Sequence, residues 1–140
     1  MLKSDTITEL RIALTVENLD EALKLYREGL GFSVVKEWDE ATGRGVILSA
    51  GRATLELIDS AQAEHIDQVE VGERIAGPVR LAMEFPDLQS AINAAKSTGA
   101  RLIHEPVLAP WNTHVARLEA PDGMQITFFK DVDDVKEAGE

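Results

Sequence analysis

An internal repeat constrains the fold of this chain more than any other feature. The segment Arg80–Gly99 repeats the pattern of Arg11–Gly31 at an offset of 69 residues. Each copy begins with a run that alternates apolar with polar or small residues, which is typical of a strand with one buried face. Asn18 or Asp87 then precedes a segment with apolar residues at helical spacing, as in a helix capped by an Asx side chain. The repeat therefore predicts two β-α units in one chain.

Three further strands are predicted after each unit, so each half should have the order β-α-β-β-β. The expected strands are Ile7–Val16, Phe32–Asp39, Val46–Ser49, Thr54–Ile58, Val79–Phe85, Arg101–Glu105, Thr113–Glu119 and Met124–Lys130. The expected helices are Leu19–Gly29 and Leu88–Thr98, with a hairpin turn at Thr42–Gly45 and a loop at Pro106–Asn112. We expect one domain over residues 1–140, with modules at 7–58 and 79–130, a linker at 59–78 and an acidic tail at 131–140. The linker could hold a short helix within Ala61–Val69.

Composition limits the classes of function. The net charge is −11, but Asp59–Pro78 and Asp131–Glu140 each contain five acidic residues and one basic residue, which leaves −3 for the two modules. This acidity favours solubility and argues against a nucleic-acid partner, which would require a basic face. The chain has no Cys, which excludes disulfides, thiolate nucleophiles and iron–sulfur clusters. Without an apolar run of about 20 residues or a signal-peptide core, no membrane partner is expected and the cytoplasm is the expected location.

Two motifs resemble those of a known family. Asn-Leu-Asp-Glu-Ala-Leu-Lys-Leu-Tyr lies at residues 18–26, and Pro-Trp-x-x-x-Val-Ala-Arg-Leu-x-x-Pro-Asp-Gly lies at residues 110–123. Together with the repeat, they resemble the vicinal oxygen chelate superfamily of glyoxalases, bleomycin-resistance proteins and extradiol dioxygenases. The resemblance implies an α+β fold in which two βαβββ modules form curved mixed sheets around a central cavity, with the helices outside. Many members pair as dimers, so a homodimer is expected.

The resemblance also implies where a metal would bind. Metal-dependent members use one inward side chain from each of four strands, and the matching positions here are Arg11, Glu56, Arg80 and Thr127. The family's enzymes usually carry His or Gln, Glu, His and Glu at these positions. Arginine has no lone pair to offer a metal and stays protonated in proteins. We therefore expect no metal and no other cofactor.

Two alternatives remain for the inward arginines. Arg11, Glu56 and Arg80 could satisfy one another as a cross-strand tie. Alternatively, one arginine is left over and grips a carboxylate, enolate or phenolate through two parallel hydrogen bonds. Glu84 also faces inward on the alternation and could neutralise the extra charge.

Aromatic and histidine residues complete the set of candidates. Trp111 could stack a planar ligand or anchor its loop or a dimer contact, and Trp38 and Phe129 could line the cavity or pack at its edge. His114 could act as a general base if it faces inward, or it could be a surface residue. The candidate ligand-binding residues are therefore Arg11, Glu56, Arg80, Glu84, Trp111, His114, Thr127, Trp38 and Phe129, and the candidate catalytic residues are Glu56 and His114.

The sequence favours a metal-free protein that binds a small organic molecule, such as an aromatic or drug-like compound, as the antibiotic-sequestering branch of the family does. The alternative is an enzyme: a metal-independent lyase or isomerase with Glu56 or His114 as base and an arginine stabilising an oxyanion. A divalent-metal lyase or dioxygenase is the least favoured version, because the ligand set is incomplete.

Overall fold

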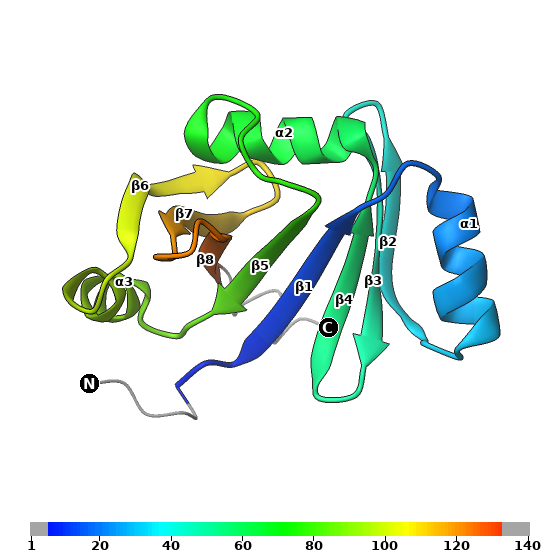
Figure 1. The fold of residues 1–140 in the computed structure, drawn as a ribbon, viewed down its shortest axis with the longest axis horizontal. Helices are drawn as coiled ribbons and strands as arrows, with labels where there is room; N and C mark the ends of the chain where they lie inside the picture. Colours follow the sequence, from blue (N-terminus) through cyan, green and yellow to red (C-terminus); the bar gives the residue numbers. More distant parts are fainter. Residues whose placement is uncertain (1–5, 133–140) are drawn as a thin grey trace.

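The computed structural model describes residues 6–132 as one curved eight-stranded sheet with helices on both faces (Figure 1). The acidic tail predicted at 131–140 therefore lies almost wholly outside the described residues. In chain order the elements are β1 (Glu9–Thr15), α1 (Leu19–Leu23), η1 (Lys24–Gly29), β2 (Val34–Glu40), β3 (Gly43–Ala50), β4 (Ala53–Ile58), α2 (Ser60–Val71), β5 (Val79–Glu84), α3 (Leu88–Ser97), β6 (Arg101–Ala109), β7 (Thr113–Glu119) and β8 (Gln125–Asp131). Across these residues, none of the helices combines the length and apolarity needed to cross a bilayer.

The two modules join edge to edge through their first strands. The strand order is β2-β3-β4-β1-β5-β8-β7-β6, with β1 antiparallel to β5 and each module closed by one parallel pair, β1–β4 or β5–β8. The register places Ala13 directly opposite Arg80. The predicted α+β fold with two βαβββ modules is confirmed, and the modules pair within one chain.

One face of the sheet is covered by the two repeated helices. Ile12 and Leu14 pack with Leu19 and Leu23 of α1. In the second module, Met83 of β5 and Phe85, the residue after this strand, pack with Ala91 and Ile92 of α3, together with other apolar side chains of β7 and β8. These residues alternate along their strands with the inward-facing set, as the sequence pattern predicts. We call the opposite face, which carries Arg80 and Thr127, the inner face.

Helix α2 lies across the inner face and contacts both modules. Asp59 caps its first turn by accepting a hydrogen bond from the Gln62 N–H (2.8 Å), and Gly72 ends it with φ of 83°. In Figure 1 the helix runs above both halves of the sheet, while α1 and α3 lie on the outside. The linker helix predicted within Ala61–Val69 is therefore longer than expected, and it covers part of the cavity that the family resemblance implies.

Two other elements differ from the prediction. The first helix has the expected extent, but its second half is a π-helix, with Leu30 N–H bonding to the Leu25 carbonyl (2.8 Å). Strand β6 continues past Glu105 to Ala109 through irregularities in its pairing with β7. Pro106 is tolerated there because β6 is an edge strand, where an N–H need not be paired.

Glycines at the start of β3 allow α2 and Trp38 to approach the sheet. A Cβ atom at Gly43 would collide with the backbone of Gln62, and one at Gly45 would collide with the Trp38 ring. The predicted turn over Thr42–Gly45 is therefore wrong for these two residues. Both glycines belong to strand β3, where the space that a side chain would fill is occupied by α2 at Gly43 and by the Trp38 ring at Gly45.

We predict that Gly43→Ala lowers the free energy of unfolding by about 1–3 kcal/mol more than Gly51→Ala does, as expected for overpacking. Both glycines have positive φ (133° and 73°), but the space beside Gly51 is open. Urea denaturation of the two variants measures this difference, to which both the collision with α2 and the less accessible φ of Gly43 contribute. Equal losses would show that α2 does not sit closely on β3.

Candidate functional site

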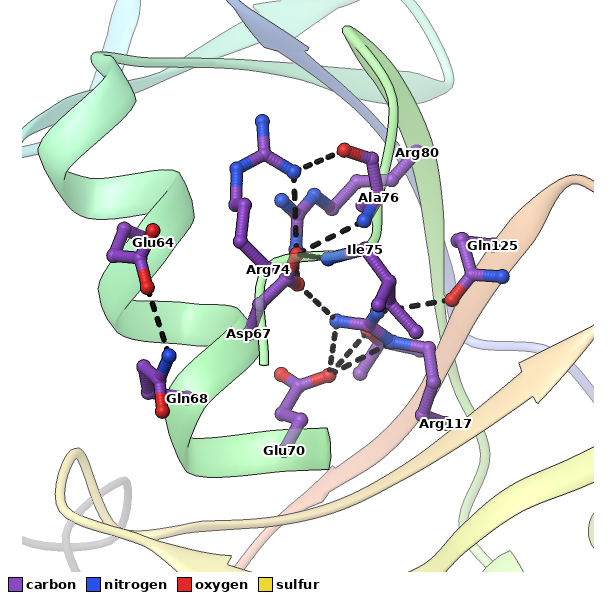
Figure 2. Close-up of polar contacts among 11 residues, drawn as sticks. Glu64, Asp67, Gln68, Glu70, Arg74, Ile75, Ala76, Arg80, Arg117 and Gln125 are labelled. Atoms are coloured by element: carbon purple, nitrogen blue, oxygen red, sulfur yellow. Dashed lines mark hydrogen bonds and ion pairs between the residues drawn. The ribbon is translucent and has the colours of Figure 1, made fainter. Parts of the chain in front are cut away.

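The carboxylate of Asp67 on α2 is the centre of a buried polar network on the inner face (Figure 2). One oxygen accepts from Arg80 Nη1 (2.7 Å) and Arg117 Nη2 (2.8 Å). The other accepts from the backbone N–H groups of Ile75 and Ala76, each at 2.9 Å, and from Arg74 Nη1 at 3.2 Å. Asp67 therefore ties α2, the turn that follows it, and both strands that carry these arginines.

The hydrogen bonds around Asp67 keep its carboxylate ionised. Burial by itself would raise the pKa of Asp67, but the bonds from the Ala76 backbone and Arg117, with the charges of Arg80 and Arg117, outweigh it. The pKa accordingly lies at about 2. The acid is a permanent negative charge at neutral pH.

Glu70, one turn further along α2, binds the second buried arginine. Its Oε1 accepts from Arg117 Nε (3.3 Å) and Nη2 (3.0 Å), and from the Thr127 hydroxyl (2.7 Å). Arg117 Nη1 donates to Gln125 Oε1 (3.1 Å), so every nitrogen of this fully buried guanidinium has a partner. Burial raises the pKa of Glu70, against the opposing effects of Arg117 and Thr127.

Arg11 is also paired, but with Glu9 on its own strand. Its Nε donates to one oxygen of Glu9 (3.0 Å), and Nη2 forms an ion pair with the same oxygen at 2.9 Å. Thr54 donates to that oxygen as well (2.6 Å). The Arg11 guanidinium lies over the Phe129 ring, 5.0 Å from its centroid, which is a cation–π geometry. The predicted tie through Arg11, Glu56 and Arg80 is therefore replaced by separate pairs with Glu9 and Asp67.

Arg80 is the exception among the inner-face arginines. Its side chain is only 4% exposed and uses Nη1 to bind Asp67. Nε and Nη2 are buried without a partner, and these two atoms form the edge of the guanidinium that binds a carboxylate bidentately. The corresponding edges of Arg11 and Arg117 are occupied by Glu9 and Glu70. The burial of Arg80 lowers its pKa, although Asp67 opposes the effect.

Glu56 lies within the electrostatic reach of Arg11 and Arg80 and remains partly accessible to solvent. Burial among protein atoms raises the pKa of Glu56, and the charges of Arg11 and Arg80 only partly offset this. Within residues 6–132, no hydrogen bond joins Glu56 to either guanidinium. A partly accessible carboxylate and an unoccupied arginine edge thus lie close together on the inner face.

The other predicted residues have varied environments. Trp38 lies over Gly45 on the inner face, and Phe129 is buried among Ala82, Ala109 and Val115. Glu84 accepts from the Thr8 hydroxyl (2.9 Å) rather than from Arg80.

Trp111 and His114 do not join Glu56 and Arg80. The Trp111 ring meets His65 of α2 edge-on, with centroids 5.8 Å apart, which matches the loop-anchor alternative. His114 is exposed and alternates with buried Thr113 and Val115 on β7, so it faces away from Glu56. The role of His114 as an inward general base is therefore unsupported.

A separate cavity lies on the other side of the sheet. It has a volume of about 530 Å³ between α3 and the rings of Phe85 and Phe128, and its remaining lining comes from Ala91, Ala94, Ala95, Ser97 and Thr98. It contains no charged group. The chemistry of the chain is therefore concentrated on the inner face, not in this cavity.

Sequence comparison places the chain in a family. The sequence model described as the Glyoxalase/Bleomycin resistance protein/Dioxygenase superfamily matches residues 10–128. The chain belongs to this superfamily. No curated protein matches it significantly.

Solved structures of the superfamily share the fold at low identity. Methylmalonyl-CoA epimerase from Mycobacterium tuberculosis is 24% identical with a TM-score of 0.66, covering 100% of this chain and 97% of its own. A hypothetical protein from Bacillus halodurans C-125 is 20% identical with a TM-score of 0.65, at coverages of 89% and 94%. A superfamily member from Vibrio splendidus 12B01 is 15% identical with a TM-score of 0.58, at coverages of 90% and 100%. These likenesses establish the fold.

The residues at the superfamily's metal positions do not fit a metal ion. Arg80 is bonded to Asp67, Arg11 is bonded to Glu9, and the Thr127 hydroxyl donates to Glu70. Only Glu56 offers a carboxylate, and the Thr127 hydroxyl is a weak ligand. Across residues 6–132, no three His, Asp or Glu side chains converge as a metal site would require.

Sequence reasoning missed Asp67, Glu70 and Arg117. The two acids were counted with the solvated linker charge, yet Ala63, Asp67 and Glu70 share one buried face of α2 at helical spacing. Arg117 lies between buried apolar neighbours in the Val-Ala-Arg-Leu motif. An arginine within a buried strand requires a carboxylate partner, and this signal could have directed attention to the acidic linker.

We predict that Asp67→Asn lowers the free energy of unfolding by about 3–5 kcal/mol at pH 7, because it leaves two buried guanidinium groups short of a counter-charge. Glu64→Gln on the exposed side of α2 is the control and should change stability by less than about 0.5 kcal/mol.

The same pair of variants gives a pH test. A carboxylate with a lowered pKa stabilises the fold above its unfolded pKa of about 3.9 and loses that effect as pH falls toward about 2. The difference in free energy of unfolding between wild type and Asp67→Asn, measured by urea denaturation, should therefore become smaller as pH falls over this range. A gap that stays constant from pH 5 to pH 2 would contradict the assignment.

Proposed function

We propose that this protein binds a small organic acid on the inner face without a metal, with the ligand's carboxylate held in the Nε–Nη2 edge of Arg80. The unpartnered edge of this buried guanidinium is the observation that carries the proposal. Leaving buried donors unpaired costs about 1–3 kcal/mol each, more for charged groups. A ligand carboxylate would accept hydrogen bonds from both donors. It would also give Arg80 a second negative charge, since the carboxylate of Asp67 is shared between Arg80 and Arg117.

The surroundings of Arg80 support an organic ligand rather than a simple anion. Phe129, on the strand that pairs with β5, places aromatic surface beside Arg80, and Glu56 is partly accessible to solvent. Binding pockets for small molecules commonly combine apolar walls with a few polar groups that fix orientation. One similar solved structure is a methylmalonyl-CoA epimerase in complex with methylmalonyl-CoA, which is consistent with a fold that holds an acyl carboxylate.

We predict that Arg80→Lys weakens carboxylate binding at least about tenfold while the protein stays folded. Lysine keeps a cation beside Asp67 but lacks the planar fork for a bidentate carboxylate. The measurement is the shift in melting temperature with benzoate, butyrate and 2-oxobutyrate, confirmed by calorimetric titration.

Arg101→Lys is the matched control for this substitution. Arg101 also binds one carboxylate oxygen through Nε and Nη2, that of Glu119, but on the surface. Its variant should bind the acids like wild type. If Arg80→Lys also binds them like wild type, the Arg80 edge is not the ligand site.

A second candidate function is proton transfer by a metal-independent isomerase or lyase. The raised pKa of Glu56 beside Arg11 and Arg80 favours it, because a base needs a pKa near the working pH and a cation would stabilise the enolate. Glu56 would remove a proton from the carbon next to the ketone of a 2-oxo acid, and the Arg80 edge would bind one carboxylate oxygen together with the developing enolate oxygen.

We predict, for the enzyme version, that the protein catalyses deuterium exchange from D₂O into C3 of 2-oxobutyrate and that Glu56→Gln slows it at least about a hundredfold. Glu56→Gln should still bind the acid, because Arg80 is unchanged. Proton NMR measures the exchange. Binding without any exchange in wild type would leave the protein as a binder.

A further inference from the structure

We propose that the ligand site extends onto α2, where Gln62 and Thr15 hold a second polar group of the ligand. The ligand would then be an acid that carries a hydroxyl group at the end away from its carboxylate. This inference rests on the proposed binding of a carboxylate at Arg80 and adds the class of acid.

The unpartnered buried polar atoms point to this extension. Within residues 6–132, the buried side-chain nitrogen and oxygen atoms without a partner are Arg80 Nε, Arg80 Nη2, Thr15 Oγ1 and Gln62 Oε1. Folded proteins satisfy nearly all such atoms, so each exception requires an explanation. All four belong to residues on the inner face or on the helix that covers it. A single ligand could satisfy them together.

The β1–β5 register fixes where Thr15 lies relative to Arg80. Ala13 is directly opposite Arg80, and the Thr15 N–H bonds to the Pro78 carbonyl (2.8 Å). Thr15 is therefore the diagonal neighbour of Arg80 on the same face. Cα atoms in this relation lie about 7–8 Å apart. A hydroxyl and a guanidinium at this separation suit the two ends of a small molecule.

Gln62 approaches the same region from α2. Its backbone packs on Gly43, and the residue is 7% exposed. Gly45, the next residue of β3 on the inner face, lies in one cross-strand row with Ile58 and Thr15. Asp67, five residues further along α2, contacts Arg80. Five residues of helix advance about 7–8 Å. Gln62 thus lies about that far along the helix from the Arg80 contact. It starts near Thr15, because Ile58, the residue opposite Thr15, is followed directly by Asp59, which accepts a hydrogen bond from the Gln62 N–H (2.8 Å).

The chemistry of the two side chains defines the missing group. An amide oxygen only accepts a hydrogen bond, whereas a threonine hydroxyl can both donate and accept. A ligand hydroxyl complements this pair, because it can donate to Gln62 Oε1 and accept from Thr15 Oγ1. A purely apolar tail would leave both atoms unpaired and would lose affinity for that reason.

Two matched pairs of probes test this: benzoate with 4-hydroxybenzoate, and butyrate with 4-hydroxybutyrate. Calorimetric titration gives the Kd of each acid for wild type, Thr15→Val, Gln62→Met and Arg80→Lys. Gln68→Met, at an exposed position of α2, is the control. We expect wild type to bind the hydroxy acid of at least one pair about tenfold or more tightly than its partner. Thr15→Val and Gln62→Met should each remove most of that preference while leaving the unsubstituted acid unaffected.

The outcomes separate this inference from the proposed function. If both acids of each pair bind equally and Arg80→Lys weakens them equally, the carboxylate site stands and the second subsite is overturned, its atoms being satisfied by water. A hydroxyl preference that persists in both Thr15→Val and Gln62→Met also overturns the subsite. If none of the four acids binds wild type, the proposed function and the inference fail together.

Discussion

The buried carboxylate of Asp67 is the interaction on which the rest of the inner face depends. It accepts hydrogen bonds from two arginines on different strands and from the backbone that follows α2. Buried guanidinium groups are costly without a counter-charge. The helix is therefore held over the sheet by charge and hydrogen bonds as much as by apolar contact, and Ala63 and the glycines beneath its first turn let it lie close.

The three inner-face arginines differ in one structural respect. Glu9 and Glu70 occupy the bidentate edges of Arg11 and Arg117, whereas the edge of Arg80 is unoccupied. In this superfamily member, the centre of the inner face thus combines a fixed cation with Glu56, whose pKa burial raises. Such a pair can orient an acid or support proton transfer, so the binding and enzyme proposals differ only in whether Glu56 moves a proton.

Covering the inner face also changes what the fold offers a ligand. An open cavity between the two modules would expose Arg80 to solvent, and water would then satisfy its donors. Beneath α2 these donors have almost no solvent exposure, which makes each unpaired atom more costly and each matching ligand group more favourable. The helix that stabilises the two arginines therefore also requires that a ligand bound beside them form hydrogen bonds with the buried donors.

The sequence by itself determined the two βαβββ modules, the alternation that turns Ile12 and Leu14 outward and Arg80 inward, and the arginines at two of the superfamily's metal positions. These features depend on local periodicity and on the identity of single residues, which are visible along the chain. Only the tertiary structure decided that Asp67 and Glu70 are buried, that Arg117 joins them, and that Arg80 keeps an open edge. Those facts depend on contacts between residues about 13 to 57 positions apart in the sequence. In addition, α2 is only weakly amphipathic, so its apolar residues do not predict that it is buried.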